Sequence, residues 1–396
     1  MKLKQVMTYL GTACVAVGCS VLLAGCPSKR GGSGSDRGPI RVGVLLSQTG
    51  TIGPYGQRAL KGVQLAVSQI NQKGLLNGRK VAIFTQDAQS SAKEAVSAYR
   101  KLTSVDNVKI VLGDIYSTTS LAVAPLAESD HVLMMAPGAS NPKFRYMGDY
   151  IFRNWTSDEF DGRALADYAY NKMKITSSAI IYQQTDYTAG LSKAFSSHLT
   201  SLGGTVGSSE TISDGASDAR QAVTKVLSSQ PSTIFVCAMS KESGVVVKFL
   251  RENGFKGQIL ATLSVDSPEF FKLAKNDANG IVFSTPAFDP TDKSPRVAEF
   301  VSVYKEKFGS APDVAAAHAY DAMEILAYAI TKAGSDEPNK IRDAIYNIKN
   351  FPGVTGRTTF DKMGDVTKPI IIKEISNGNA KSLEKYDVQP EKGKGL

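Results

Sequence analysis

The polar segment 113–120 could bind a carboxylate, because it brings hydroxyl groups and free backbone N–H groups to the start of a helix. A second polar segment, 136–142, is by itself ordinary turn chemistry and becomes more specific because it lies at the adjacent strand end. Each follows a short apolar run that predicts a buried strand, at 108–112 and at 132–136. The candidate residues are Ser117, Thr118, Gly138, Ala139 and Ser140. The carboxyl ends of parallel strands meet at one sheet edge, where α/β proteins bind ligands and helix N-termini attract anions. Ser117 or Thr118 could instead be a simple helix cap, which stabilises a helix by about 1 kcal/mol.

Two tyrosines are candidates for further contacts with the same ligand. Tyr55 lies in the glycine-rich loop 47–56, whose glycines permit a tight turn and a close approach of the backbone to a ligand. Tyr187 lies between an expected strand at 179–182 and an expected helix at 189–202. It could instead be an aromatic residue of a surface loop.

Catalytic chemistry is poorly supported by the sequence. The three histidines are scattered, and the sequence contains no nucleophile elbow, zinc-protease motif, C-x-x-C pair or phosphate loop. Cys237 lies in an apolar run typical of a buried strand, so a core position is expected for it rather than a nucleophilic role. We therefore expect no metal, no cofactor and no enzymatic activity.

The charge of the chain does not indicate a nucleic-acid partner. The formal net charge is +9, and loss of Lys2 and Lys4 with an N-terminal leader would leave +7. The basic residues are spread along the chain, and no basic tract interleaved with aromatic residues is present. The remaining charge predicts a modest attraction to anionic lipid surfaces or acidic solutes.

The segment 41–74 predicts the elements that position Tyr55. The apolar run 40–46 is short and rich in β-branched residues, as in a parallel strand buried on both faces. After Gly56, apolar residues recur on one face at the helical period, and these are Ala59, Leu60, Val63, Ala66, Val67 and Ile70. The glycine-rich loop should therefore join the carboxyl end of a strand to the start of a helix.

Strand-like and helix-like segments alternate along the rest of the chain, which is typical of repeated βα units. A length of 396 residues exceeds one ordinary core and predicts two lobes. Beyond the opening strand, the predicted strands are 81–85, 108–112 and 132–136, then 179–182, 205–212, 233–238, 258–263 and 281–284. Residues 358–360 and 369–375 are predicted to form a final β pair on the second lobe, and 381–396 a polar tail.

The first 25 residues predict a secretory leader. A basic start is followed by the mostly apolar or small residues 10–23. The leader ends in Leu-Ala-Gly-Cys, which resembles the lipobox of bacterial lipoproteins and implies cleavage before Cys26 and lipid attachment to its thiol. Residues 26–39 are a Gly/Ser-rich linker that would tether the folded body to a membrane.

The opening unit resembles the start of the periplasmic leucine/isoleucine/valine-binding proteins, which are amino-acid receptors of the type I solute-binding fold. The residues that carry the likeness are Thr49, Gly50, Tyr55, Gly56, Ile70, Asn71 and Gly74. The likeness extends from about residue 40 to 376 and implies an α/β fold of two doubly wound parallel-sheet lobes, with hinge crossings near Asn154, Pro286 and Gly356. It assigns residues 40–155 and 286–355 to lobe 1, and 156–285 and 356–380 to lobe 2.

The resemblance also implies roles in the cleft. In the family, a serine at the place of Ser117 grips the ligand carboxylate. The segment 136–142 matches a P-x-A-[ST] segment whose backbone and hydroxyl, here that of Ser140, hold the same head group. Tyr187 matches a tyrosine that closes over the ligand.

One departure from the family pattern concerns the ligand amine. Amino-acid-binding relatives place an acidic residue where Leu263 stands here. Asp266, three residues on, could substitute for it. If it points away, the ligand could be a carboxylic acid or amide without an amine, since a desolvated, unpaired ammonium costs several kcal/mol.

The lipobox-like leader and the family resemblance together imply a monomeric, lipid-anchored receptor on the extracytoplasmic side of the cell envelope. It would bind a small polar solute between its lobes by hinge closure and deliver it to the permease of an ABC importer. An amino acid, branched-chain or similar, is the expected solute. A sensory receptor for amides, urea or carboxylic acids, and an extracytoplasmic α/β enzyme, remain the alternatives.

Overall fold

The computed structural model describes residues 38–74 and 78–387. The predicted leader, the lipidation site Cys26, most of the linker and the last part of the predicted tail lie outside these ranges. In the part that is described, no helix combines the length and the apolar character needed to cross a bilayer.

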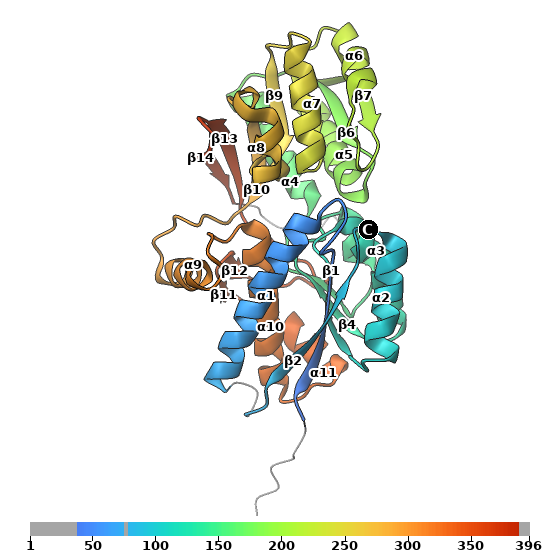
Figure 1. Cartoon of the computed structure of the whole chain (residues 1–396), viewed down its shortest axis with the longest axis vertical. Coiled ribbons are helices and arrows are strands. Elements are labelled where there is room, and N and C mark those ends of the chain that lie inside the picture. The colour runs from blue at the N-terminus through green and yellow to red at the C-terminus, as the bar shows by residue number, and fades with distance from the viewer. Residues whose placement is uncertain (1–37, 75–77, 388–396) are drawn as a thin grey trace, which may run out of the picture. The chain divides into compact units, whose positions relative to one another are not determined.

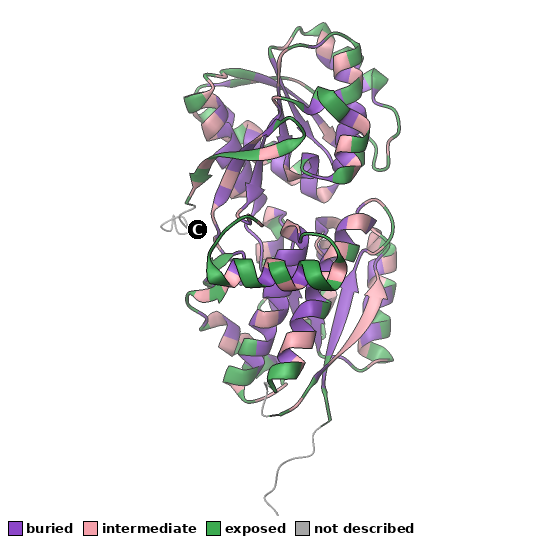
Figure 2. Ribbon diagram, turned by 60° about the vertical axis from the view of Figure 1, so that its left-hand side comes forward, coloured by how far each residue is buried: buried purple, intermediate pink, exposed green. Residues whose placement is uncertain are grey.

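The first lobe is built on five parallel strands in the order β2-β1-β3-β4-β5. Their bounds are β1 Ile40–Leu46, β2 Val81–Asp87, β3 Ile110–Leu112, β4 Leu133–Ala136 and β5 Ile151–Arg153. The helices of this lobe are α1 Gly53–Lys73, α2 Ala92–Ser104, α3 Ser117–Ser129, α9 Pro295–Phe308, α10 Val314–Ala333 and α11 Pro338–Tyr346. One apolar core lies between the sheet and α1 and α10, and a second lies on the α2 and α3 side. The sheet is therefore covered on both faces, and Figure 2 shows its central strands as buried.

Helices α1 and α10 pack side by side (Figure 1). They approach closely where Gly62 meets the backbone of Ala316. A Cβ atom added at Gly62 would lie 2.1 Å from the backbone oxygen of Ala316. Because that obstacle is backbone, the two helices would have to move apart. Gly62→Ala is therefore expected to lower the free energy of unfolding by about 1–3 kcal/mol in urea titrations. Gly207→Ala is the control, since nothing lies within 4 Å of its added Cβ, and equal losses in both variants would contradict the prediction.

The second lobe is built on seven strands in the order β14-β13-β10-β9-β8-β6-β7. Their bounds are β6 Ser177–Gln183, β7 Thr205–Ile212, β8 Thr233–Cys237, β9 Gln258–Thr262, β10 Val282–Pro286, β13 Ile370–Ser376 and β14 Asn379–Tyr386. The helices are α4 Asp158–Asp167, α5 Asp186–Ser201, α6 Arg220–Ser228, α7 Ser240–Glu252 and α8 Pro268–Ala274. Strands β6 to β10 are parallel, whereas β13 and β14 join antiparallel at one edge. Short helical turns occupy Pro142–Tyr146, Tyr168–Lys172, Leu263–Val265 and Lys275–Ala278.

The predicted ending of the chain is wrong in two places. Residues 358–360 do not pair with 369–375, because β12 (Gly356–Thr358) pairs with β11 (Phe351–Gly353) in a separate two-stranded sheet. Phe360 and Val366 then pack in the first lobe's core. The third crossing therefore follows Val366, later than the predicted point near Gly356.

The predicted polar tail contains a strand. β14 forms an antiparallel pair with β13 along its length (Figure 1). The side chains of β14 are exposed or half-buried. Such a strand needs no apolar pattern, and its sequence has none. An edge strand of this kind is stabilised by its backbone pairing, which hydrophobic periodicity does not report.

Candidate functional site

A pocket lies between the two lobes, where loops that follow strands of the two sheets face each other. The first lobe contributes Ile52, Tyr55, Ile115, Tyr116, Gly138, Ser140, Val314 and Ala315, the crossing contributes Trp155, and the second lobe contributes Tyr187, Met239, Leu263 and Ser264. Most of these side chains are aliphatic or aromatic. Such a lining suits a ligand with an apolar body and a few polar groups that fix its orientation.

Four of the predicted ligand-binding residues line this pocket, namely Tyr55, Gly138, Ser140 and Tyr187. Tyr55 is fixed by a 2.6 Å hydrogen bond between its hydroxyl and that of Ser240 on the other lobe. Gly138 packs so closely on Ile115 that an added Cβ would meet it at 2.8 Å. The loop after β4 therefore brings its backbone to the pocket because position 138 has no side chain.

Three other predicted residues lie outside the pocket lining and make contacts within the protein. The Ser117 hydroxyl accepts a 3.2 Å hydrogen bond from the backbone N–H of Asn141. The Thr118 hydroxyl accepts one of 3.4 Å from the N–H of Asp186 on the second lobe. Ala139 accepts a 3.1 Å bond at its carbonyl from Arg153. Ser117 thus holds the 138–141 loop, and its direct grip on a ligand carboxylate stays a prediction.

The structure does not bring Asp266 to the pocket. The turn Leu263–Val265 leaves Leu263 on the pocket wall and Asp266 exposed. There the Asp266 carboxylate lies 3.7 Å from the ammonium of Lys373. The Asp266 carboxylate already has a partner and does not line the pocket, so Asp266 does not take the place of the missing acid, contrary to the prediction.

Asp158, which the sequence reasoning missed, is a buried carboxylate at the start of α4. It is 1% exposed, and neither carboxylate oxygen has a hydrogen-bond partner among the described residues. Its backbone N–H donates a 2.9 Å bond to the carbonyl of Ser140. Burial, and next the charge of Asp161, raise the pKa of Asp158 well above its ordinary value, while the Ser140 hydroxyl and Arg153 oppose that shift.

Tyr187, one of three tyrosines that line the pocket, interacts electrostatically with the same carboxylate. The Tyr187 hydroxyl is buried and has no hydrogen-bond partner among the residues described. Burial, followed by the charges of Asp158 and Asp161, raises its pKa. Asp158 does not itself line the pocket, but it contacts Ser140 and interacts electrostatically with Tyr187, both of which do. The sequence signal was ambiguous, because Ser157 followed by acidic residues is also an ordinary helix start.

Asp161 lies one turn further along α4 and predicts a pH effect on stability. It is 2% exposed, and burial raises its pKa to about 6 although the Ser284 hydroxyl lowers it. Because the folded-state pKa exceeds the unfolded value, stability from this group is lost as the pH rises from about 4 to about 6. Asp161→Asn should therefore be the more stable protein at pH 7.5, by on the order of 3 kcal/mol. Urea titrations should show that this advantage shrinks at pH 4.5, and an advantage independent of pH would contradict the prediction.

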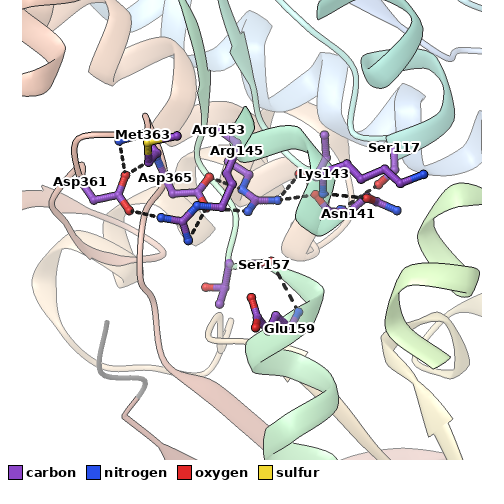
Figure 3. Close-up of polar contacts among 12 residues, drawn as sticks. Ser117, Asn141, Lys143, Arg145, Arg153, Ser157, Glu159, Asp361, Met363 and Asp365 are labelled. Carbon is purple, nitrogen blue, oxygen red and sulfur yellow. Dashed lines mark hydrogen bonds and ion pairs between the residues drawn. The ribbon is translucent and has the colours of Figure 1, made fainter. Parts of the chain in front are cut away.

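Arg153 fixes the loop that carries Ser140 (Figure 3). It is fully buried, and its Nε and Nη2 donate bonds of 2.6 and 2.7 Å to the two carboxylate oxygens of Asp365. Its Nη1 donates to the carbonyls of Ala139 and Asn141 at 3.1 and 3.0 Å. The guanidinium thus joins the loop to the chain segment that precedes the third crossing.

Further polar contacts cross between the lobes around the pocket. The Asn141 amide donates a 2.6 Å bond to the carbonyl of Asp186, and the Thr51 hydroxyl donates one of 3.1 Å to Asp214. Together with the bond between Tyr55 and Ser240, these contacts hold the two lobes together around the pocket. The arrangement is that of a two-lobed binding protein closed on its cleft.

Comparison with known sequences agrees with this geometry. A family described as periplasmic binding protein matches residues 39–380. The chain belongs to this family. A Leu/Ile/Val-binding protein homolog of Brucella abortus is 28% identical over 337 residues, which cover 85% of this chain and 90% of that protein. These matches confirm the family that the opening βα unit of the sequence resembles.

Solved structures extend the likeness to three dimensions. A leucine-binding protein, LivK, of Thermotoga maritima has a TM-score of 0.84 at 30% identity and covers 88% of this chain and 99% of its own. LivJ of Streptococcus pneumoniae, solved with isoleucine, has a TM-score of 0.81 at 26% identity and covers 89% of this chain and 100% of its own. These matches confirm the type I fold expected from the opening βα unit. The similar proteins are binding receptors, and this chain is a substrate-binding receptor of the same general kind.

Proposed function

We propose that this periplasmic binding protein binds an amino acid with an apolar side chain and delivers it to the permease of an ABC importer. The observation that carries the proposal is Asp158, a buried carboxylate without a partner among the described residues, beside the pocket residues Ser140 and Tyr187. An ammonium group is the natural partner of such a carboxylate, because pairing removes the cost of the unpaired buried charge.

The rest of the pocket supports the same class of ligand. The loop around Ser140 and the N-terminal end of α3 would receive the ligand carboxylate through hydroxyl and backbone N–H groups. The wall formed by Ile52, Met239 and Leu263 would receive an aliphatic side chain. The similarity to a protein solved with isoleucine supports this assignment.

We further propose that the mature protein is a lipid-anchored monomer in the cell envelope. This rests on the lipobox-like sequence before Cys26 and on the Gly/Ser-rich linker after it. Expression of the full chain in a bacterial host with labelled palmitate tests the anchor. Label in the wild type and none in Cys26→Ala is the expected result, and equal labelling would contradict it.

A ligand screen by thermal shift, followed by calorimetry, tests the binding proposal. Leucine, isoleucine and valine are expected to raise the melting temperature of the wild type. Their 2-oxo acid analogues are the matched controls, because they keep the carboxylate and side chain but lack the amine. Equal binding of the oxo acids would contradict the role of the ammonium and favour a carboxylic-acid receptor. No shift with amino acids, amides, urea or aromatic acids would contradict the receptor proposal itself.

A further inference from the structure

A second chamber lies between the lobes beside the main pocket. It has a volume of about 400 Å³ and is lined by Gly50, Thr51, Pro54 and Tyr55 from the first lobe and by Gly215, Ser240, Lys241, Glu242 and Glu269 from the second. Tyr55 lines both cavities. Its hydrogen bond to Ser240 therefore stands at the boundary between the chamber and the main pocket.

Glu242 supplies this chamber with a buried acid. The residue is 1% exposed, and neither oxygen of its carboxylate has a hydrogen-bond partner within residues 38–74 and 78–387. It stands in the first turn of α7, where the helix dipole favours a negative charge. Burial raises the pKa of Glu242 and Asp214 adds to this shift, while the backbone N–H of Glu242 and next the charge of Lys241 oppose it.

Glu269 adds a second carboxylate oxygen without a partner among the described residues. The other oxygen of Glu269 lies 3.4 Å from Nη1 of Arg58, whose Nε is bonded to Asp313 at 2.6 Å. Arg58 does not line the chamber, whereas Lys241 does. Lys241 is exposed, and its ammonium lies 3.5 Å from the carbonyl of Gly215. Lys241 thus has another contact, while carboxylate oxygens of both Glu242 and Glu269 have no hydrogen-bond partner among the described residues.

We propose that this chamber binds a primary ammonium group, held by Glu242 and assisted by Glu269. A metal ion is the poorer occupant, because no cluster of three or more His, Cys, Asp and Glu side chains suited to a metal occurs in the described part of the chain. A primary ammonium needs only hydrogen-bond acceptors, and a carboxylate pair supplies them. The ammonium belongs either to a separate alkylammonium ion or to the side-chain end of an amino acid bound in the main pocket. The second source rests on the proposed function.

Calorimetry on the full-length protein distinguishes these sources. n-Butylammonium tests the chamber alone, because it has no amino-acid head group. Lysine and norleucine test an attached ammonium, because they share the head group and differ at the end of the side chain. The variants are Glu242→Gln and, as control, Glu252→Gln, which removes an exposed carboxylate of the same helix.

We expect Glu242→Gln to weaken the affinity for n-butylammonium at least tenfold, or to abolish a tenfold preference for lysine over norleucine, while Glu252→Gln behaves as wild type. An effect on n-butylammonium alone identifies a separate ion, and an effect on lysine identifies a ligand terminus. The proposal is overturned if the wild type neither binds n-butylammonium nor prefers lysine, or if Glu242→Gln binds both as wild type does. Failure of norleucine and leucine to bind would overturn the proposed function only, because n-butylammonium still reports on the chamber.

The stability of the empty protein gives a second readout. Glu242→Gln keeps the shape of the side chain but removes the unpaired buried charge, so its melting temperature without ligand should rise. A purely structural carboxylate would give a lower melting temperature on neutralisation. Glu269→Gln is the second variant and should show the same loss of ammonium affinity to a smaller extent, since one of its oxygens already faces Arg58.

Discussion

Asp158→Asn should weaken amino-acid binding by about a hundredfold or more and, at the same time, raise the melting temperature of the ligand-free protein. Removal of one partner of a buried, hydrogen-bonded charge pair costs about 2–5 kcal/mol of affinity. In the empty protein the same carboxylate has no partner among the described residues, so its neutralisation removes an electrostatic cost. Calorimetry with the best ligand of the screen and thermal denaturation measure the two effects.

Glu159→Gln is the control for this variant. Glu159 is the next residue of α4 but is only half-buried, and it faces Arg163 at 3.7 Å, so its neutralisation should leave affinity unchanged. The 2-oxo acid analogue should bind wild type and Asp158→Asn with similar affinity, because it has no ammonium. If Asp158→Asn binds the amino acid as wild type does, Asp158 is not the ammonium partner.

The same pairing predicts a dependence of affinity on pH. In the empty protein the pKa of Asp158 is raised, and an ammonium beside it would lower that pKa. Binding would therefore release a proton, and affinity should rise with pH across the interval between the two pKa values. Calorimetry in buffers of different ionisation enthalpy counts the released proton, and Asp158→Asn should release none.

The sequence predicted the local elements of the fold well where periodicity and capping agree. Strand β1 formed as expected, and helix α1 formed with the predicted buried face but begins at Gly53, inside the predicted loop. Ser91 caps α2 by accepting a bond from the N–H of Glu94. The ending of the chain failed because β14 and the 351–360 segment depend on pairing with distant residues. Local pattern carries no information on such partners.

The sequence predicted site residues that closely follow a buried strand. It missed Asp158, whose role depends on the burial of its side chain in the folded protein. Tyr55, Gly138, Ser140 and Tyr187 line the pocket. Gly138 and Ser140 lie in a loop as predicted, whereas Tyr55 and Tyr187 lie in the first turns of α1 and α5 and not in the loops before them. Asp158 lies in a polar helix start, and nothing in the sequence shows that its carboxylate is buried in the folded protein. Asp266 was chosen because it is close to Leu263 in the sequence. In the structure its side chain points toward Lys373 instead.

Asp365→Asn should destabilise the protein severely. It leaves the fully buried Arg153 without the bidentate acceptor that it now contacts at 2.6 and 2.7 Å. Breaking a buried pair in this way costs about 3–5 kcal/mol, because an uncompensated charge remains. Urea unfolding measures the loss. Asp218→Asn is the matched control, since Asp218 contacts Arg220 at 2.6 Å in a largely exposed pair whose loss should change stability little.

The double variant Arg153→Met/Asp365→Leu separates stability from loop positioning. Replacement of a buried ion pair by apolar side chains of similar volume is often neutral or stabilising, so the double variant should regain most of the stability that Asp365→Asn loses. It should not regain ligand affinity, because a methionine side chain at position 153 cannot donate to the carbonyls of Ala139 and Asn141 and the loop that carries Ser140 loses its anchor. Recovery of stability and affinity together would show that the pair serves the fold alone, whereas recovery of stability without affinity assigns Arg153 the positioning of the pocket loop.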